Sequence, residues 1–368
     1  MTRSEPVSIE VSLADRSYPV LVGRGLLDRP DSYAAVPTGV RRALVVTQAP
    51  VMAAGHVEPV EVALQARGID VVRHELPDGE MAKVTDVLHG TWCAAAAAGL
   101  GRGDLVVAVG GGVVGDLAGF AAATWNRGVA VLQVPTTLLA QVDAAIGGKT
   151  GINLPDGKNL VGAFWQPVGV VCDVSALTTL SPRLRTEGLG EVVKYGLIRD
   201  PRILELIEGR LDDLQAGDTS LLEDLVRRSV AVKADVVSGD ETEQGARAHL
   251  NLGHTFGHVI EALTGYDQVL HGEAVAMGTV VALQLGVRLG HTPGHVAARG
   301  EAVLHSVGLP TRPPRLDRER VWEVMARDKK ATVDGIRFVV LDDLARPIVV
   351  TPPRSVVDAV LDEITVVG

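Results

Sequence analysis

The chain has 368 residues, of which 46% are hydrophobic, 22% are charged and only 3% are aromatic. At about 150 residues per domain, this length favours two domains, with cores built mainly from Val, Leu, Ile and Ala. The formal net charge of −10 argues against nucleic acid or an anionic membrane surface as the main partner. An anionic ligand must therefore be held by a local group of Lys and Arg.

The first residues do not have the pattern of a secretory signal, and no uninterrupted apolar run reaches about 18 residues. The two cysteines, Cys93 and Cys172, lie in apolar strings, which predicts buried thiols in a reducing compartment. We therefore expect a globular cytoplasmic protein without membrane spans.

Strand and helix patterns alternate through the first half of the chain. This alternation indicates an α/β domain with a mostly parallel, Rossmann-like sheet that helices cover on both faces. The expected strands are residues 7–13, 18–22, 42–47, 70–76, 105–109, 129–134 and 168–173, and the expected helices are 57–67, 84–98, 117–127 and 137–145.

From about Ser181 onward the hydrophobic periodicity becomes helical. Helices are expected at 184–195, 201–213, 219–239, 274–290, 293–307 and 317–330 and around the histidine-rich run at 250–261, with one isolated β-like run at 337–341. The sequence therefore predicts an α/β domain over residues 1–180, followed by a mainly α-helical domain over residues 181–368.

Three histidines, His254, His258 and His271, lie within 18 residues of one another in a chain with only 10 histidines. His254 and His258 are four positions apart, so on a helix their imidazoles share one face. A third histidine one short loop away can complete a metal site, whereas capping or core histidines are the alternative. A catalytic metal usually also binds a carboxylate. The candidates are Glu191, Glu261 and Glu273.

An apolar run at 105–109 leads into a glycine-rich turn and then an apolar helix. Gly110, Gly112 and Gly115 have the G-x-G-x-x-G spacing of turns that bind a pyrophosphate with backbone N–H groups. No acidic residue ends the next strand, at 129–134, where a ribose-binding carboxylate would stand. We expect nucleotide binding by an unusual arrangement, with a simple tight turn as the alternative.

A Gly-rich segment then holds Asp143, Lys149, Lys158 and Asn159 within 17 residues. On a predicted loop, such a cluster would let an acidic protein bind a phosphorylated, carboxylated small molecule, and a solvated surface loop is the alternative. Farther along, Glu191 and Lys194 are three positions apart on one helical face, a spacing that is most often a surface ion pair.

Taken together, these strings resemble the 3-dehydroquinate synthase family, sugar-phosphate cyclases of the shikimate pathway. The similar strings keep the order of the family along the chain. They are residues 77–80, 110–116, 135–143, 147–153, 157–164, 191–196, 250–258, 271–275 and 328–330.

The resemblance implies a metal, zinc or cobalt, held by Glu191, His254 and His271, so that His258 is left for the substrate. It implies NAD contacts from Asp78, Gly79, Glu80, Lys83, Gly112, Val113, Val114, Gly115, Asp116, Thr136, Thr137, Lys149, Lys158, Ala176, Leu177, Thr178 and Thr179. It implies substrate contacts from Arg127, Asp143, Lys149, Asn159, Lys194, Lys233, Arg247, Asn251, His258 and one or both of Lys329 and Lys330.

The implied reaction converts 3-deoxy-D-arabino-heptulosonate 7-phosphate to 3-dehydroquinate and phosphate. NAD is used catalytically: an alcohol is oxidised, phosphate is eliminated, the hydride is returned, the ring opens and an aldol step closes the carbocycle. The implied partner is a phosphorylated sugar acid, and a homodimer is expected. Two alternatives remain, an aminodehydroquinate synthase or other secondary-metabolite cyclase, and a metal-dependent polyol dehydrogenase. Arg247, Asn251 and Lys330 favour a substrate that carries a carboxylate.

Overall fold

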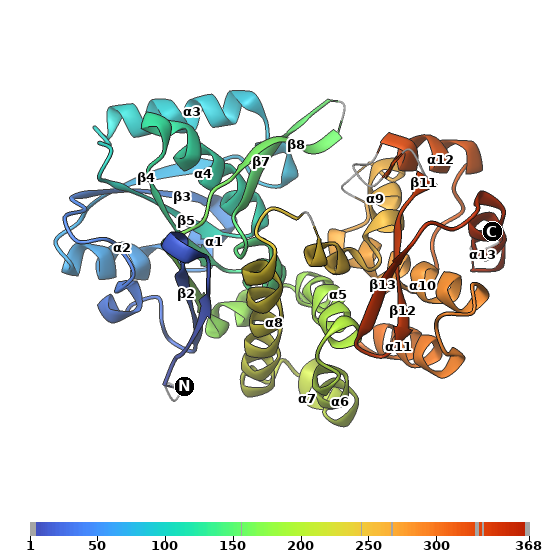
Figure 1. Ribbon diagram of the computed structural model, residues 1–368. Coiled ribbons are helices and arrows are strands. Elements are labelled where there is room, and N and C mark those ends of the chain that lie inside the picture. Colours follow the sequence, from blue (N-terminus) through green and yellow to red (C-terminus); the bar gives the residue numbers. More distant parts are fainter. Residues whose placement is uncertain are drawn as a thin grey trace. The chain divides into compact units, whose positions relative to one another are not determined.

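The computed structural model describes residues 5–155, 157–243, 245–265, 268–327, 331–332 and 335–364 (Figure 1). The chain forms two compact units. The first contains Met1–Arg185 and Leu222–Thr242, and the second contains Thr186–Leu221 and Glu243–Gly368. Most of helix α8 (Thr219–Gly239) therefore belongs to the first unit, although it follows that unit's other elements in the sequence.

The first unit is built on a seven-stranded sheet with the strand order β1-β2-β9-β6-β5-β3-β4. Only β1 runs antiparallel to its neighbour, and every other pairing is parallel. The mostly parallel, Rossmann-like sheet predicted from the sequence is thus confirmed. Its strands are β1 (Val7–Val11), β2 (Tyr18–Gly23), β3 (Arg42–Gln48), β4 (Asp70–Leu76), β5 (Leu105–Gly110), β6 (Ala130–Pro135) and β9 (Gly169–Asp173).

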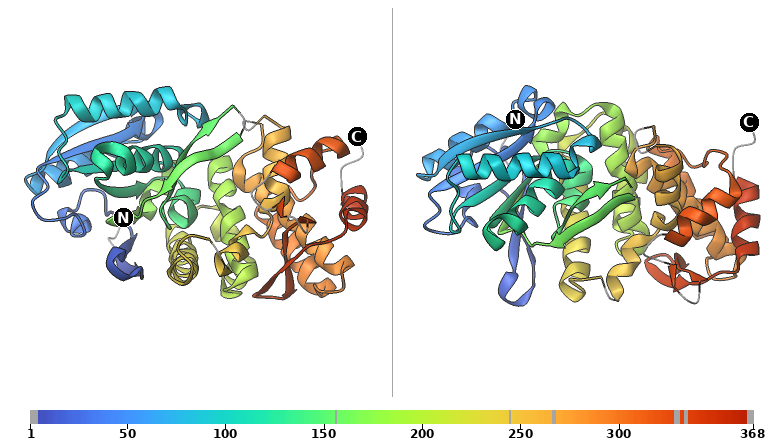
Figure 2. Two further views of the ribbon diagram at one scale, coloured as in Figure 1. Left: turned by 45° about the horizontal axis from the view of Figure 1, so that its top comes forward. Right: turned by 90° about the horizontal axis from the view of Figure 1, so that it is seen from above.

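Successive side chains of the central strands enter two different cores, because side chains alternate between the faces of a strand. Val45 packs in the core that contains helix α2 (Val57–Ala66), whereas Val46 packs in the core that contains α4 (Gly112–Thr124). Helix α3 (Thr85–Ala97) lies beside α4 on the same face (Figures 1 and 2). Coverage of both faces explains why these strands are continuous aliphatic runs.

Two segments after β6 differ from the prediction. The expected helix at 137–145 is a short π-helical turn, Ala140–Ala144. The expected loop after it is an antiparallel hairpin of β7 (Lys149–Leu154) and β8 (Gly157–Phe164). Gly151 faces Gly162 in this hairpin, and a Cβ on Gly162 would lie 2.0 Å from the carbonyl oxygen of Thr150. The glycines that suggested a loop instead allow two backbones to approach closely.

The second unit is mainly helical, as predicted. Phe256, Met277 and Phe338 pack in its core beside the C-terminal helix α13. The second strand of its hairpin, β13, and helix α13 were not predicted. Its elements are α5 (Pro182–Ile198), α6 (Arg202–Gly209), α7 (Leu211–Gln215), α9 (His254–Leu263), α10 (His271–Arg288), α11 (Gly294–Ser306), α12 (Arg318–Arg327), β10 (Ala331–Thr332), β11 (Gly335–Ile336), β12 (Phe338–Asp343), β13 (Arg346–Val350) and α13 (Arg354–Ile364).

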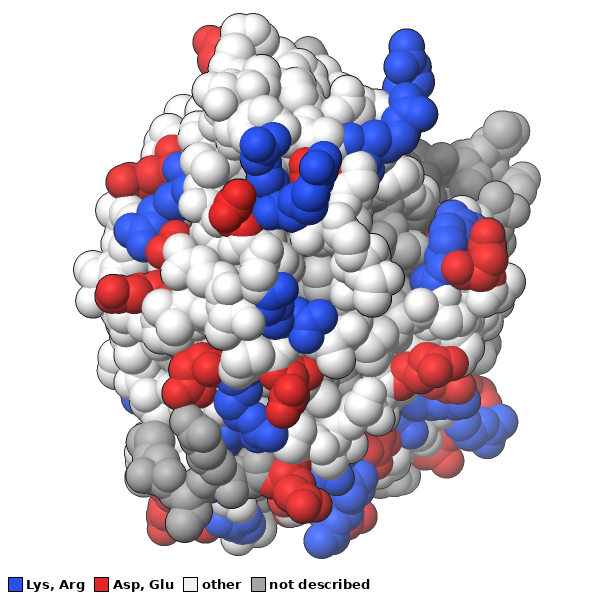
Figure 3. Space-filling view, turned by 90° about the vertical axis from the view of Figure 1, so that its left-hand side faces the viewer, with Lys and Arg blue, Asp and Glu red and all other residues white. Residues whose placement is uncertain are grey.

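The surface carries both signs of charge. On the face shown in Figure 3, Lys and Arg side chains lie among Asp and Glu side chains. Within the described ranges, no helix is long and apolar enough to cross a membrane. Cys172 is buried as predicted, but Cys93 is exposed on α3, so the prediction of a buried thiol was wrong there. Cys93 shares the exposed side of α3 with Ala96 and Ala97, so the apolar string there did not indicate burial.

Candidate active site

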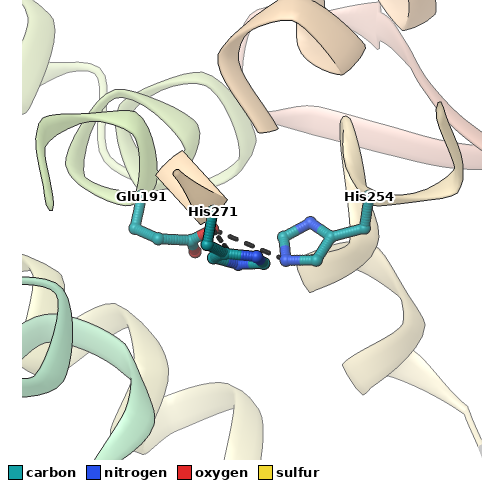
Figure 4. Close-up of side chains that lie close together, drawn as sticks. All are labelled: Glu191, His254 and His271. Carbon is teal, nitrogen blue, oxygen red and sulfur yellow. Dashed lines mark ion pairs between the residues drawn. The ribbon is translucent and has the colours of Figure 1, made fainter. Parts of the chain in front are cut away.

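A carboxylate and two imidazoles meet inside the second unit. Glu191 of α5 is fully buried, and its Oε1 atom lies 3.5 Å from Nε2 of His254 and 3.7 Å from Nε2 of His271 (Figure 4). One ligand atom from each of the three residues lies within 4.8 Å of the other two. This is the carboxylate and histidine set that catalytic zinc sites use.

Close helix packing through glycines brings these residues together. Gly190 precedes Glu191 and Gly272 follows His271; a Cβ on Gly190 would lie 2.5 Å from the carbonyl oxygen of Gly272. Gly253, which precedes His254, has φ +81°, and a Cβ there would lie 2.6 Å from the carbonyl oxygen of Val275 on α10. Helices α5 and α9 therefore reach α10 at the positions of the three candidate ligands.

The protonation pattern of the site suits a metal. Nδ1 of His254 lies 3.2 Å from the carbonyl oxygen of Leu252, which can only accept a hydrogen bond. A neutral His254 satisfies this contact with its proton on Nδ1, and the lone pair of Nε2 then faces Glu191. Oε1 of Glu191 is buried and has no hydrogen-bond partner among the described atoms. A buried carboxylate oxygen beside an imidazole lone pair is costly unless a cation joins them.

Two other predicted substrate residues, Lys194 and His258, contact this triad. Lys194 is buried on α5 and forms an ion pair with Oε2 of Glu191. The ring of His258 lies 5.6 Å from that of His254. The 3-10 turn Ala246–Asn251 carries buried Arg247 and also Asn251, whose Nδ2 donates to Glu243 at 3.2 Å. The structure thus brings Lys194 and His258 to the triad, and it places Arg247 and Asn251 on one turn of the same unit. Lys329 and Lys330 lie outside the described residues.

In the first unit, the predicted cofactor residues gather where the parallel strands end. Gly110 ends β5, and α4 begins at Gly112, so Gly112, Val113, Val114, Gly115 and Asp116 form the first turn of α4. No side chain caps this helix end. Thr136 and Thr137 follow β6, and the backbone N–H of Thr136 donates to Gly110 at 2.9 Å. A glycine-rich helix start without a side-chain cap leaves backbone N–H groups for a pyrophosphate.

A buried lysine links the cofactor segments to the hairpin. Nζ of Lys83 lies 2.6 Å from Asp116 and 2.5 Å from Oδ1 of Asn159, which has φ +54°. Burial raises the pKa of Asp116, and the charge of Lys83 opposes that rise. Asn153 extends the network: its Nδ2 donates to Glu80 at 2.8 Å, and its Oδ1 accepts from the backbone of Asn159 at 2.9 Å.

The remaining predicted residues of the first unit lie on several different elements. Lys233 of α8 donates to the carbonyl oxygen and to Oδ1 of Asp143, each at 2.5 Å. Lys149 begins β7, and Lys158 on β8 lies 3.9 Å from Glu80. Asp78 accepts from the N–H of Gly79, which has φ +75° and open space where a Cβ would be.

Ala176, Leu177, Thr178 and Thr179 form most of a 3-10 turn that follows β9. Asp173 precedes the turn and accepts hydrogen bonds from Ser175 and from the backbone of Gly25, Leu26 and Leu27. Nε2 of His56 lies 2.8 Å from Oγ1 of Thr179. These contacts fix the turn at the same edge of the sheet as Thr136.

Arg127 is the exception among the predicted residues. It follows α4 and precedes β6, and neighbouring Asn126 donates to the carbonyl oxygen of Leu100, ahead of β5. Arg127 therefore lies at the amino-terminal edge of the parallel strands, opposite the edge that holds Gly112 and Thr136. The structure does not bring it together with the other candidates of its unit.

Sequence reasoning missed several residues that hold the candidates in place. Asn153 lay within a quoted string, so a signal existed, but its side-chain partners were not foreseeable. Gln133 on β6 donates to the carbonyl oxygen of Gly115 at 3.2 Å. Asp173 and His56 hold the turn after β9, and no motif marked either residue.

Two family models match consecutive parts of the chain. Residues 73–187 match the family model described as 3-dehydroquinate synthase N-terminal, and residues 188–331 match the one described as 3-dehydroquinate synthase C-terminal. The chain is 45% identical over 356 residues to a 3-dehydroquinate synthase of Pseudomonas entomophila, covering 96% of each chain. It is 46% identical over 348 residues to one of Paracoccus denitrificans, covering 93% of this chain and 94% of that protein.

Solved structures show the same fold. A 2-epi-5-epi-valiolone synthase from Streptomyces hygroscopicus with NAD+ and Zn2+ bound has a TM-score of 0.87 and 26% identity, covering 96% of this chain and 98% of that one. A 2-deoxy-scyllo-inosose synthase complexed with carbaglucose-6-phosphate, NAD+ and Co2+ has a TM-score of 0.86 and 25% identity, covering 97% and 100%. An iron-containing alcohol dehydrogenase, at 18% identity and a TM-score of 0.66, shares the fold over 89% and 93%.

Proposed function

The chain belongs to the 3-dehydroquinate synthase family, and we propose that it converts 3-deoxy-D-arabino-heptulosonate 7-phosphate to 3-dehydroquinate and phosphate. It is then a carbon–oxygen lyase that uses NAD and a divalent metal. The observation that carries the proposal is the Glu191, His254 and His271 set, with ligand atoms within 4.8 Å, in a chain about 45% identical to named synthases over nearly its whole length.

A metal held by Glu191, His254 and His271 would polarise a substrate alcohol and lower its pKa, while NAD would supply the hydride acceptor. The chain's own groups do the rest. Arg247 offers a buried guanidinium that can hold a carboxylate or phosphate with two parallel hydrogen bonds. Lys194 supplies a second buried positive charge beside Glu191. We assign Asn251, His258 and Lys330 to the same substrate.

In the first unit, we assign NAD to the edge formed by the turn before α4, the segment Asp78–Lys83 and the 3-10 turn after β9. The Lys83–Asp116–Asn159 network supports this proposal, because its partly buried hydrogen bonds tie the segment Asp78–Lys83 to the start of α4 and to the β7–β8 hairpin. We assign Asp143, Lys149, Asn159 and Lys233 to substrate, but not Arg127, which lies at the opposite edge of the sheet. The functional division remains an NAD domain over residues 1–180 and a metal and substrate domain over residues 181–368.

We propose zinc as the metal, with cobalt as a substitute, and a place in the shikimate pathway of aromatic amino acid biosynthesis. We also propose a cytoplasmic homodimer. NAD and a phosphorylated sugar acid are anions that a lipid bilayer retains, so an enzyme that needs both would act inside the cell. Analytical ultracentrifugation tests the dimer, and cell fractionation tests the location.

The decisive assay compares phosphate release from 3-deoxy-D-arabino-heptulosonate 7-phosphate and from its amino analogue at equal concentrations. We expect the first to be the better substrate and product to exceed one equivalent of NAD without net NADH absorbance. Preference for the amino analogue would instead establish an aminodehydroquinate synthase. Stoichiometric NADH from a simple polyol would establish a dehydrogenase and overturn the proposal.

A further inference from the structure

The three carboxylates that the sequence offered as metal ligands have three different surroundings. Glu191 faces both histidines. Glu273 accepts a hydrogen bond from the backbone N–H of Leu270 at 2.9 Å, so it caps the start of α10. Glu261, on α9, is buried, and its Oε2 lies 3.2 Å from Nδ1 of His271. Glu261 therefore lies behind a candidate ligand.

The contact between Glu261 and His271 determines which ring nitrogen of His271 is available to a metal. An ionised carboxylate only accepts hydrogen bonds, so a proton on Nδ1 of His271 is the arrangement that satisfies both groups. The other ring nitrogen, Nε2, then carries the lone pair and faces Oε1 of Glu191 at 3.7 Å. Glu261 thus selects the tautomer and holds the ring plane.

The two candidate histidines differ in the group that contacts their Nδ1 atom. Nδ1 of His254 faces a neutral carbonyl oxygen, that of Leu252. Nδ1 of His271 faces a buried carboxylate that comes from α9, the helix that also carries His254. A negative partner makes an imidazole a stronger ligand than a neutral partner does.

From this geometry we propose that Glu261 is a positioning residue of the metal site: it orients His271 and strengthens the bond of His271 to the metal without binding the metal itself. The inference rests on the metal site of the proposed function. The test of Glu261 measures zinc affinity rather than activity. The role of Glu261 can therefore be disproved while the synthase activity holds. Conversely, zinc affinity can depend on Glu261 even if the enzyme catalyses a different reaction.

The test measures zinc dissociation constants of wild type, Glu261→Gln and Glu261→Ala by competition with a chromophoric chelator. Loss of an outer carboxylate partner typically weakens metal binding by about 10- to 100-fold. Glu261→Ala should show that loss. Glu261→Gln should show a smaller loss, because its amide oxygen still accepts from Nδ1. Cobalt spectra of the variants should shift from that of wild type.

Glu273→Gln is the matched control. It removes the same charge two residues from His271, but from a carboxylate that accepts from the backbone N–H of Leu270 and caps the start of α10. We expect its zinc affinity to equal that of wild type. Equal losses in Glu273→Gln and Glu261→Gln would reduce the effect to net charge and overturn the proposal, as would wild-type affinity in both Glu261 variants.

A second measurement separates positioning from folding. In the metal-free protein, nitrogen-15 NMR of the histidines reports which ring nitrogen carries the proton. We expect His271 to hold its proton on Nδ1 in wild type and in Glu261→Gln, and to lose that preference in Glu261→Ala. A proton on Nε2 of His271 in folded, metal-free wild type would overturn the proposal directly.

Discussion

Gly190 of α5 and Gly272 of α10 lie in direct backbone contact next to the candidate metal ligands. A Cβ on Gly190 would lie 2.5 Å from the carbonyl oxygen of Gly272, and a Cβ on Gly272 would lie 1.9 Å from that of Glu187. Each glycine adjoins a candidate ligand, Glu191 or His271. The distance between these two ligands therefore depends on the absence of two side chains.

We predict that Gly272→Ala separates α5 from α10 at the site. Overpacking of this kind typically costs about 1–3 kcal/mol of unfolding free energy. Because His271 is adjacent, zinc affinity should fall as well. Gly294→Ala is the control, since its added Cβ meets no atom within 4 Å. Urea unfolding and chelator competition measure both effects, and wild-type zinc affinity in Gly272→Ala would contradict the predicted coupling.

Metal removal should abolish turnover without unfolding the protein. The three candidate ligands are held by helix packing rather than by the metal, because each lies on or at the start of a packed helix. Dialysis against a chelator should therefore leave the circular dichroism spectrum unchanged while activity disappears, and zinc or cobalt should restore it. Full activity in a folded sample shown to be metal-free would exclude a catalytic metal.

Asn153→Ala should weaken NAD binding. It removes two side-chain hydrogen bonds, to Glu80 and to the backbone of Asn159, each worth roughly 1 kcal/mol. Calorimetry should show a rise in the dissociation constant for NAD of about tenfold or more. Leu160→Ala, an exposed change on the same hairpin, should leave it unaltered. Equal NAD affinity in both variants would show that the hydrogen bonds of Asn153 do not contribute to NAD binding.

Much of the fold follows from local patterns. All seven strands of the main sheet and helix α8 were predicted close to their observed bounds, because buried parallel strands are short aliphatic runs between glycine turns. The hairpin β7–β8 was missed because its glycines are typical of loops, and only the facing strand reveals why Gly151 and Gly162 are small. The sequence of one strand alone does not show which residues it faces on the other strand of a hairpin.

The candidate metal set was predictable only through the family resemblance. The spacing of the histidines left His258 as an equal candidate and left three carboxylates open. Packing separates them: Glu191 reaches both imidazoles, Glu261 reaches Nδ1 of His271, and Glu273 reaches a backbone N–H. These assignments depend on where α5, α9 and α10 meet. The hydrophobic periodicity of one helix does not predict such contacts between helices.

The last prediction concerns the acid sensitivity of folding. Burial lowers the pKa of His56, against an opposing effect of Asp173, and burial also lowers the pKa of His74 and of His249. In the unfolded chain these histidines titrate near their ordinary value of about 6.5, so below that pH the unfolded state binds more protons than the native state. The free energy of unfolding should therefore be level above about pH 7.5 and fall as the pH drops from 6.5 towards 5. Urea unfolding at half-unit steps measures this slope. His56→Gln, which keeps an amide N–H for Thr179, should reduce the slope. A flat profile from pH 8 to 5, or an unchanged slope in His56→Gln, would show that burial of these imidazoles does not control the response.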